Sequence, residues 1–158
     1  MNDVNLARAL HVLAVVIWIG GVSMATTIVL PAVRRGDLGA DRLKAFRAVE
    51  HRFVWQARIA ILVVGLSGFY MIVRQDLWDR FGSPAFWWMH AMAGVWVLFA
   101  LILFVAEPLV LHRSFQRWAS TQPDRALAWL QKAHYLLLAL AVVTILGAVA
   151  GSWGGALF

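Results

Sequence analysis

Residues 81–106, FGSPAFWWMHAMAGVWVLFALILFVA, form an uncharged stretch that decides the fold of this chain. The stretch exceeds the roughly 20 apolar residues that cross a bilayer as an α-helix. Near its start, His90 lies among two tryptophans and two methionines. A histidine inside hydrocarbon is costly, so it is usually held by a partner or a metal. The stretch therefore predicts a membrane-spanning helix that carries a group able to bind a ligand.

Three further stretches lack charged residues: residues 9–33, 59–73 and 133–158. The middle one reaches spanning length when it is extended back past Arg58. Of all 158 residues, 62% are hydrophobic and 14% charged, with a mean hydropathy of +0.74, which excludes a soluble globular protein. We therefore predict an all-α, polytopic membrane protein, a single four-transmembrane-helix bundle that takes up residues 1–158.

Local signals set the ends of the four helices. Asp41 suits an N-cap, and Pro84 and Pro123 suit the first positions of the helices that follow them. Near the C-terminus, Gly147 and Gly151 have the GxxxG spacing of a close-packing helix face. We expect helices at about residues 6–33, 41–73, 84–117 and 123–151.

The basic residues are concentrated on one side of the membrane. Ten Lys and Arg residues fall within residues 34–52 and 113–132, whereas the other side carries Arg8, Arg74 and Arg80. The positive-inside rule places both termini outside a bacterial inner (plasma) membrane and the two basic loops in the cytoplasm. The formal charge of +6 therefore reflects topology and contact with the lipid bilayer, and we expect no nucleic-acid partner.

The chain contains no cysteine. Disulfides, thiolate zinc sites, iron–sulfur clusters and covalent haem attachment are therefore excluded. Any metal must be held by histidine, methionine, carboxylate or backbone groups.

The strongest candidate site lies toward the outer face. His11 and His90 enter parallel helices at similar depth, and two neutral imidazoles facing each other across a bundle hold a b-type haem. Gly94 lies one helical turn after His90, where a missing side chain leaves room for a flat macrocycle. The alternative is that both histidines donate to carbonyls or lie at the wet interface. Haem binding for membrane electron transfer is the favoured prediction.

Copper is the alternative metal for the same region. Histidine and methionine suit Cu(I), and Met89 and Met92 flank His90. At about 100° per residue these three side chains cannot converge on one ion, so a copper site would combine His11, His90 and one methionine. Core filling is the alternative role for Met89 and Met92.

A second pair of histidines lies toward the cytoplasm. His51 and His134 are at similar height on two helices that rise from that side, which permits a second haem between them. The alternative is that His51, in a charged stretch, is simply solvated.

Two charged residues lie inside apolar spans. Arg58 and Glu107 are costly there unless paired, so we expect them to face inward and toward each other. Arg58 could alternatively meet a haem propionate, and Glu107 could pass protons to a quinone or substrate. Pro108 predicts a kink directly after Glu107.

The first helix resembles that of a known group of membrane proteins. Its sequence RALHVLAVVIWIGG, residues 8–21, is similar to the first helix of CopD-like (copper resistance protein D) membrane domains and of the related HemJ-type protoporphyrinogen oxidases. The resemblance is specific for His11, Trp18, Gly20 and Gly21. It implies copper handling for the first group and a haem-bearing, porphyrinogen-oxidising protein for the second.

These observations leave three functions open: a haem protein, a copper protein of CopD type, and a structural subunit of a larger membrane complex. A quinone or a periplasmic redox partner would suit the first. Enzymatic activity and a homo-oligomeric state remain undecided by the sequence.

Overall fold

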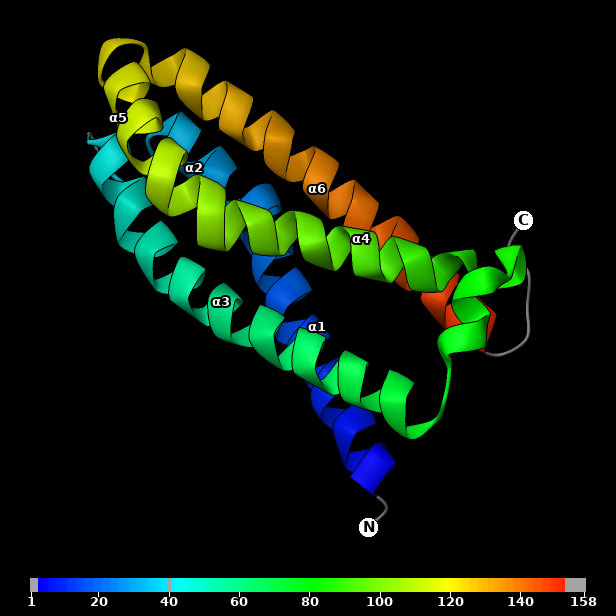
Figure 1. The fold of residues 1–158 in the computed structure, drawn as a ribbon. Helices are drawn as coiled ribbons and strands as arrows, with labels where there is room; N and C mark the ends of the chain where they lie inside the picture. Colours follow the sequence, from blue (N-terminus) through cyan, green and yellow to red (C-terminus); the bar gives the residue numbers. More distant parts are fainter. Residues whose placement is uncertain (1–2, 40, 153–158) are drawn as a thin grey trace.

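The computed structural model describes residues 3–39 and 41–152, apart from the side chains of residues 43, 110–113 and 116. Almost all of these residues are helical and none forms a strand, which confirms the all-α prediction (Figure 1). The elements are α1 (Asp3–Met24), the π-helix η1 (Ala25–Val29), α2 (Leu30–Arg35), α3 (Arg42–Arg74), the 3-10 helices η2 (Trp78–Gly82) and η3 (Pro84–Phe86), α4 (Trp87–Leu101), the π-helix η4 (Ile102–Leu111), α5 (His112–Thr121) and α6 (Pro123–Ser152).

Four helical segments are long and apolar enough to cross a membrane, as predicted. They are Asp3–Arg35, Lys44–Arg74, Pro84–Leu109 and Pro123–Ser152. The first helix begins three residues before the predicted residue 6, and the third begins with a 3-10 turn. The Asp41 side chain accepts a hydrogen bond from the Lys44 backbone N–H at 3.0 Å, which confirms it as the N-cap of α3.

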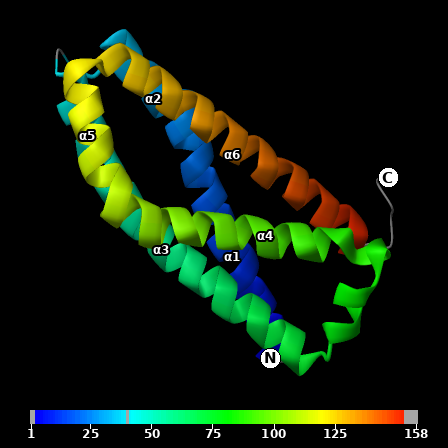
Figure 2. The ribbon, with the colours of Figure 1, turned by 45° about the horizontal axis from the view of Figure 1, so that its top comes forward.

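The four helices pack as two pairs. Figures 1 and 2 show α1 beside α3 and α4 beside α6, with the pairs diverging toward the end that holds the N-terminus. Each helix contributes a buried residue to the shared core: Trp18, Ile61, Phe99 and Ala141. Trp18 of α1 meets Phe99 of α4 edge to face, with ring centroids 4.8 Å apart. This contact defines which side of α4 faces α1.

The GxxxG face of α6 packs against aromatic rings instead of a helix backbone. The Trp87 indole lies on Gly147 and the Trp88 indole lies on Gly151, so a Cβ at either glycine would overlap a ring. Gly65 of α3 receives the indole of Trp96 in the same way. These contacts fix how α4 is rotated against its neighbours, because a ring can enter only where a side chain is missing.

The π-helix η4 contains Pro108, where a kink was predicted. Proline has no N–H, and its ring would clash with the carbonyl of Phe104 in a regular α-helix. Figure 2 shows the chain changing direction between α4 and α5, which confirms the predicted kink. The wider π-helical turn is a common response to such a break.

Candidate functional site

His11 of α1 points its imidazole at α3. Its Nδ1 lies 3.1 Å from the Val64 carbonyl oxygen and 3.1 Å from the Ser67 hydroxyl. The ring lies on Gly68, where a Cβ would come within 3.2 Å of the His11 Cε1 atom. The small residues Ser67 and Gly68 therefore leave the space that the imidazole occupies.

The partners of His11 determine which nitrogen carries its proton. The Val64 carbonyl can only accept, and the Ser67 hydroxyl donates its own proton to the Val63 carbonyl at 2.5 Å. Nδ1 is therefore the donor, and Nε2 keeps a free lone pair. Within the part of the chain that the structure describes, Nε2 has no hydrogen-bond partner. A histidine held in this way through Nδ1–H is oriented like one that binds a metal through Nε2.

His90 faces away from α1. Its side chain is exposed, and its ring meets Phe81 edge to face, with centroids 5.3 Å apart. His90 precedes Phe99 by nine residues, so at about 100° per residue it lies on the opposite side of α4 from the contact with Trp18. The structure therefore does not bring His90 and His11 onto facing sides of a single chain.

Gly94 shares the outward face of α4 with His90. It is exposed, and a Cβ built there would have nothing within 4 Å. The space beside Gly94 therefore lies outside the bundle instead of between α1 and α4, where the haem prediction needs it.

The two methionines beside His90 are the more inward residues. Met89 is only 5% exposed, and Met92 is half-buried. Met92 precedes Phe99 by seven residues, which places it on the side of α4 that faces α1. Among the described residues, no group of three or more His, Cys, Asp or Glu side chains could hold a metal ion.

Among the described residues, no hydrogen bond joins His51 and His134, the two histidines toward the basic loops. His134 donates from Nδ1 to the Leu130 carbonyl of its own helix at 2.9 Å, since a carbonyl can only accept. His51 is exposed, and no hydrogen bond or ion pair is recorded for it within residues 3–39 and 41–152. A second haem between them remains a prediction.

Arg58 and Glu107 form the expected ion pair. The Arg58 Nη2 atom donates to a Glu107 carboxylate oxygen at 2.8 Å, and the two side chains are 20% and 25% exposed. Arg58 also lies over the Trp55 ring, 5.4 Å from its centroid. Sequence reasoning found this pair because neither charge tolerates an apolar span alone.

Arg58 has a second partner that the sequence did not reveal. Its Nε and Nη2 atoms donate to the Leu103 carbonyl at 3.1 and 2.9 Å. In a π-helix this carbonyl would accept from the residue five positions later, which is Pro108 and has no N–H. Arg58 therefore supplies the donor that Pro108 lacks, and its bonds to Leu103 and Glu107 join α3 to η4.

A buried indole N–H adds to the polar groups near His11. The Trp18 side chain is 4% exposed, and its Nε1 atom has no hydrogen-bond partner among the described residues. Trp18 follows His11 by seven residues, so both lie on the same face of α1. A lone pair and a donor without partners thus share the inner face of this helix.

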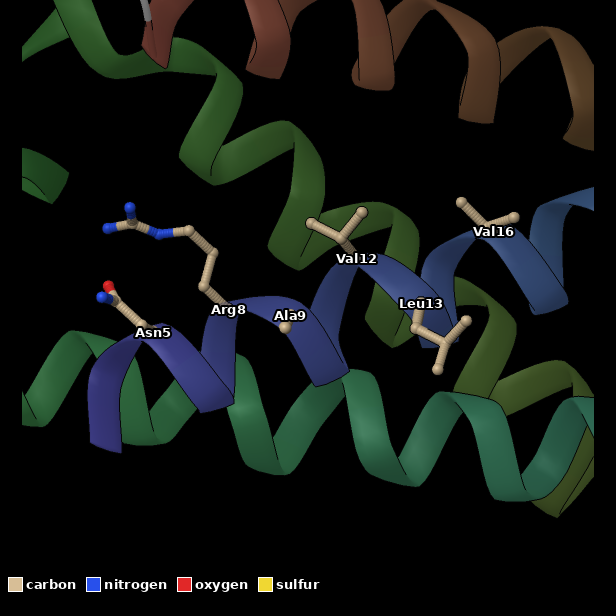
Figure 3. Close-up of a pocket in the computed structure, with 6 residues that line it drawn as sticks. All are labelled: Asn5, Arg8, Ala9, Val12, Leu13 and Val16. Atoms are coloured by element: carbon tan, nitrogen blue, oxygen red, sulfur yellow. The ribbon is translucent and has the colours of Figure 1, made fainter. Parts of the chain in front are cut away.

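A groove of about 540 Å³ runs along a different face of α1. Figure 3 shows the side chains that line it, all from this one helix. They are Asn5, Arg8, Ala9, Val12, Leu13 and Val16. His11 is not among them, and the mostly apolar lining suits contact with lipid.

No family model matches this chain, and no curated protein or solved structure is similar to it. The resemblance of residues 8–21 to CopD-like and HemJ-type proteins therefore stays a prediction.

Proposed function

We propose that this chain is a multi-pass membrane protein that binds a redox cofactor through Nε2 of His11 and takes part in membrane electron transfer. The favoured cofactor is b-type haem, since histidine is a usual axial ligand of haem iron and cofactor sites in helix bundles are built from side chains on facing helices. The observation that carries the proposal is the position of the His11 ring: Nδ1 lies within hydrogen-bonding distance of Val64 and Ser67, and Nε2 has no partner among the described residues.

The second ligand would come from α4. His90, the residue favoured by the sequence, requires either a half-turn of α4 about its axis or a second copy of the chain. Met92 already lies on the side of α4 that carries the Trp18–Phe99 contact. A histidine–methionine pair is also a known haem ligation, so both residues enter the test.

The visible spectrum of protein purified from haem-replete cells tests this proposal. His11→Ala should abolish the haem signal or convert it to that of a five-coordinate haem, because it removes an axial ligand. His90→Ala and Met92→Leu identify the second ligand, since only the ligand's loss should change the spin state. Met89→Leu is the matched control, because it changes volume little. A colourless, correctly folded wild-type protein would contradict the haem proposal.

Copper binding of CopD type is the second candidate. The observation in its favour is that Met89 and Met92 lie inward on α4 whereas His90 does not. His11 with Met92 would give a soft, thiolate-free site suited to Cu(I). Metal analysis distinguishes the copper proposal from the haem proposal. Copper should copurify with the wild-type protein without porphyrin absorbance, and His11→Ala and Met92→Leu should each lose the bound copper. A protein free of both would leave a structural subunit of a larger complex.

The orientation proposed for the bundle has both termini outside a bacterial inner membrane. The concentration of Lys and Arg at the loops within residues 34–52 and 113–132 supports it. Single cysteines in place of Gly36 or Ser120 should resist an impermeant thiol reagent in intact cells, whereas one in place of Gly82 should react. The reverse labelling pattern would invert the topology.

A further inference from the structure

A cavity of about 410 Å³, lined mostly by charged and polar residues, lies at the end of the bundle that holds the basic loops. It is formed where the C-terminal end of α2 meets the first turns of α6. Its lining residues are Pro31, Arg34, Arg35, Asp124 and Gln131. The cavity is separate from His11, and an inference about it does not rest on the proposed function.

The two acidic groups near the cavity are already paired. Arg35 donates to Asp37 at 2.8 Å, and Arg42 donates to Asp124 at 2.7 Å. Arg34 has a neutral partner, the side-chain oxygen of Gln131, and no acidic partner among the described residues. The guanidinium of Arg34 therefore gives the cavity one uncompensated positive charge.

The position of Arg34 is fixed from two sides. Gln131 is 8% exposed, and its buried amide holds the Nη1 atom of Arg34. The Arg34 backbone carbonyl accepts from Arg42 at 3.2 Å, which ties α2 to α3. Below these groups Leu30 and Leu127 are fully buried. These contacts hold Arg34 in place, and the N–H groups that do not bond Gln131 can donate to a ligand.

The start of α6 adds to the positive potential of the cavity. α6 begins at Pro123, which has no N–H, and the Ala126 N–H bonds the Gln122 carbonyl at 3.0 Å, so the partial positive charge of this first turn lies on the N–H groups of Asp124 and Arg125. A guanidinium beside a helix N-terminus is a combination that favours phosphate oxygens. Trp118 and Trp129 pack edge to face at the same end, with centroids 6.1 Å apart, as in the aromatic belt at a membrane surface.

We propose that this cavity binds the phosphate of an anionic phospholipid from the leaflet that meets the basic loops. Arg34 would donate to the phosphate oxygens while Gln131 holds the guanidinium in place. A lipid is favoured over a soluble anion because the cavity lies between two membrane-spanning helices at headgroup level. In the proposed topology this is the cytoplasmic leaflet, where anionic lipids are concentrated.

Native mass spectrometry of the full chain in detergent tests the proposal. The protein is titrated with short-chain phosphatidylglycerol, with phosphatidylcholine of the same chains, and with inorganic phosphate. Phosphatidylglycerol should bind most tightly, and Arg34→Gln should weaken it about tenfold, the size expected for loss of a hydrogen bond to a charged group. Arg125→Gln is the matched control, because Arg125 lies at the same end, bonds Gln122 and does not line the cavity.

Each other outcome overturns the proposal. Equal weakening by Arg34→Gln and Arg125→Gln would mean diffuse charge attraction without a site. Inorganic phosphate binding as tightly as phosphatidylglycerol would make the ligand a soluble anion. If Arg34→Gln does not fold, Arg34→Lys is the second variant. It keeps the charge but replaces the planar fork of the guanidinium by a single nitrogen, so it should still weaken binding several-fold. Unchanged binding by a folded Arg34→Lys or Arg34→Gln protein would exclude this cavity.

Discussion

His11 and Arg58 are both polar side chains within apolar spans, and they differ in the partners that stabilise them. Each is a polar side chain on one helix that donates to a backbone carbonyl of another, Val64 for His11 and Leu103 for Arg58. The arginine is charged, so it also needs Glu107, and the bonds of its Nε and Nη2 atoms are made within the protein. The neutral imidazole needs only one acceptor, and its second nitrogen stays available. The Arg58–Glu107 cluster therefore stabilises the contact between two helices, whereas His11 can bind a ligand.

Loss of Arg58 should be the most damaging change in this comparison. Arg58→Met leaves the carboxylate of Glu107 without its cation and should lower the free energy of unfolding by about 3 kcal/mol. The double variant Arg58→Met, Glu107→Leu should cost less than the two single changes summed, as measured by unfolding in detergent. Strict additivity would show that the two charges do not stabilise each other.

Pro108→Ala should partly rescue the Arg58→Met protein. An alanine restores the N–H that can bond the Leu103 carbonyl, a contribution of about 1 kcal/mol. In the wild-type background the same change should matter less, because Arg58 already satisfies that carbonyl. Pro31→Ala, at a proline in α2 just after the π-helix η1, is the control and should not rescue. Equal effects of Pro108→Ala on stability in both backgrounds would show that Arg58 does not replace the N–H that Pro108 lacks.

Ser67→Ala tests how firmly His11 is held. It removes one of the two acceptors at His11 Nδ1. The free energy of unfolding should fall by at most about 1 kcal/mol, because the Val64 carbonyl remains as an acceptor. In a haem-loaded protein the same change should shift the reduction potential, since the Nδ1 bond tunes the basicity of Nε2. Ser152→Ala, which removes an exposed serine bonded to its own helix, is the control. An unchanged potential would mean that Ser67 does not act on a ligating histidine.

Gly94→Ala should have the smallest effect on stability, and it should raise the free energy of unfolding instead of lowering it. Nothing lies within 4 Å of a Cβ there, so the substitution should stabilise α4 by about 0.5–1 kcal/mol through helix propensity. Gly151→Ala is the contrast, because its Cβ would overlap the Trp88 ring. Thermal unfolding of the two variants measures the difference. Destabilisation by Gly94→Ala would mean that a partner, such as a macrocycle or a second chain, occupies the face of His90.

The sequence predicted the features that follow from charge and hydrophobicity. Four apolar stretches required four spanning helices, and burial required that Arg58 meet Glu107. The rotation of each helix about its axis was not predictable in the same way. It depends on rings seated on glycines, such as Trp96 on Gly65, and any of several aromatic residues could have filled that position.

The position of His90 relative to His11 was not predictable for a related reason. A histidine in a membrane needs a partner, but a backbone carbonyl serves as well as a metal, and carbonyls are present on every helix. The sequence therefore indicated that His11 would have a partner, but it did not indicate which group the partner would be. Ser67 and Gly68 were the available signal, since both are small residues in an otherwise bulky stretch of α3.

The π-helix η4 also has an evolutionary consequence. A π-helical turn closes one residue later than an α-helical turn, so residues 102–111 hold surplus chain within the third span. A one-residue deletion there can be absorbed by a return to α-helix, leaving the aromatic contacts of α4 in place. The same deletion within α4 would rotate Trp87 and Trp88 by about 100° away from their glycines. Natural variation in length is therefore expected to collect in η4.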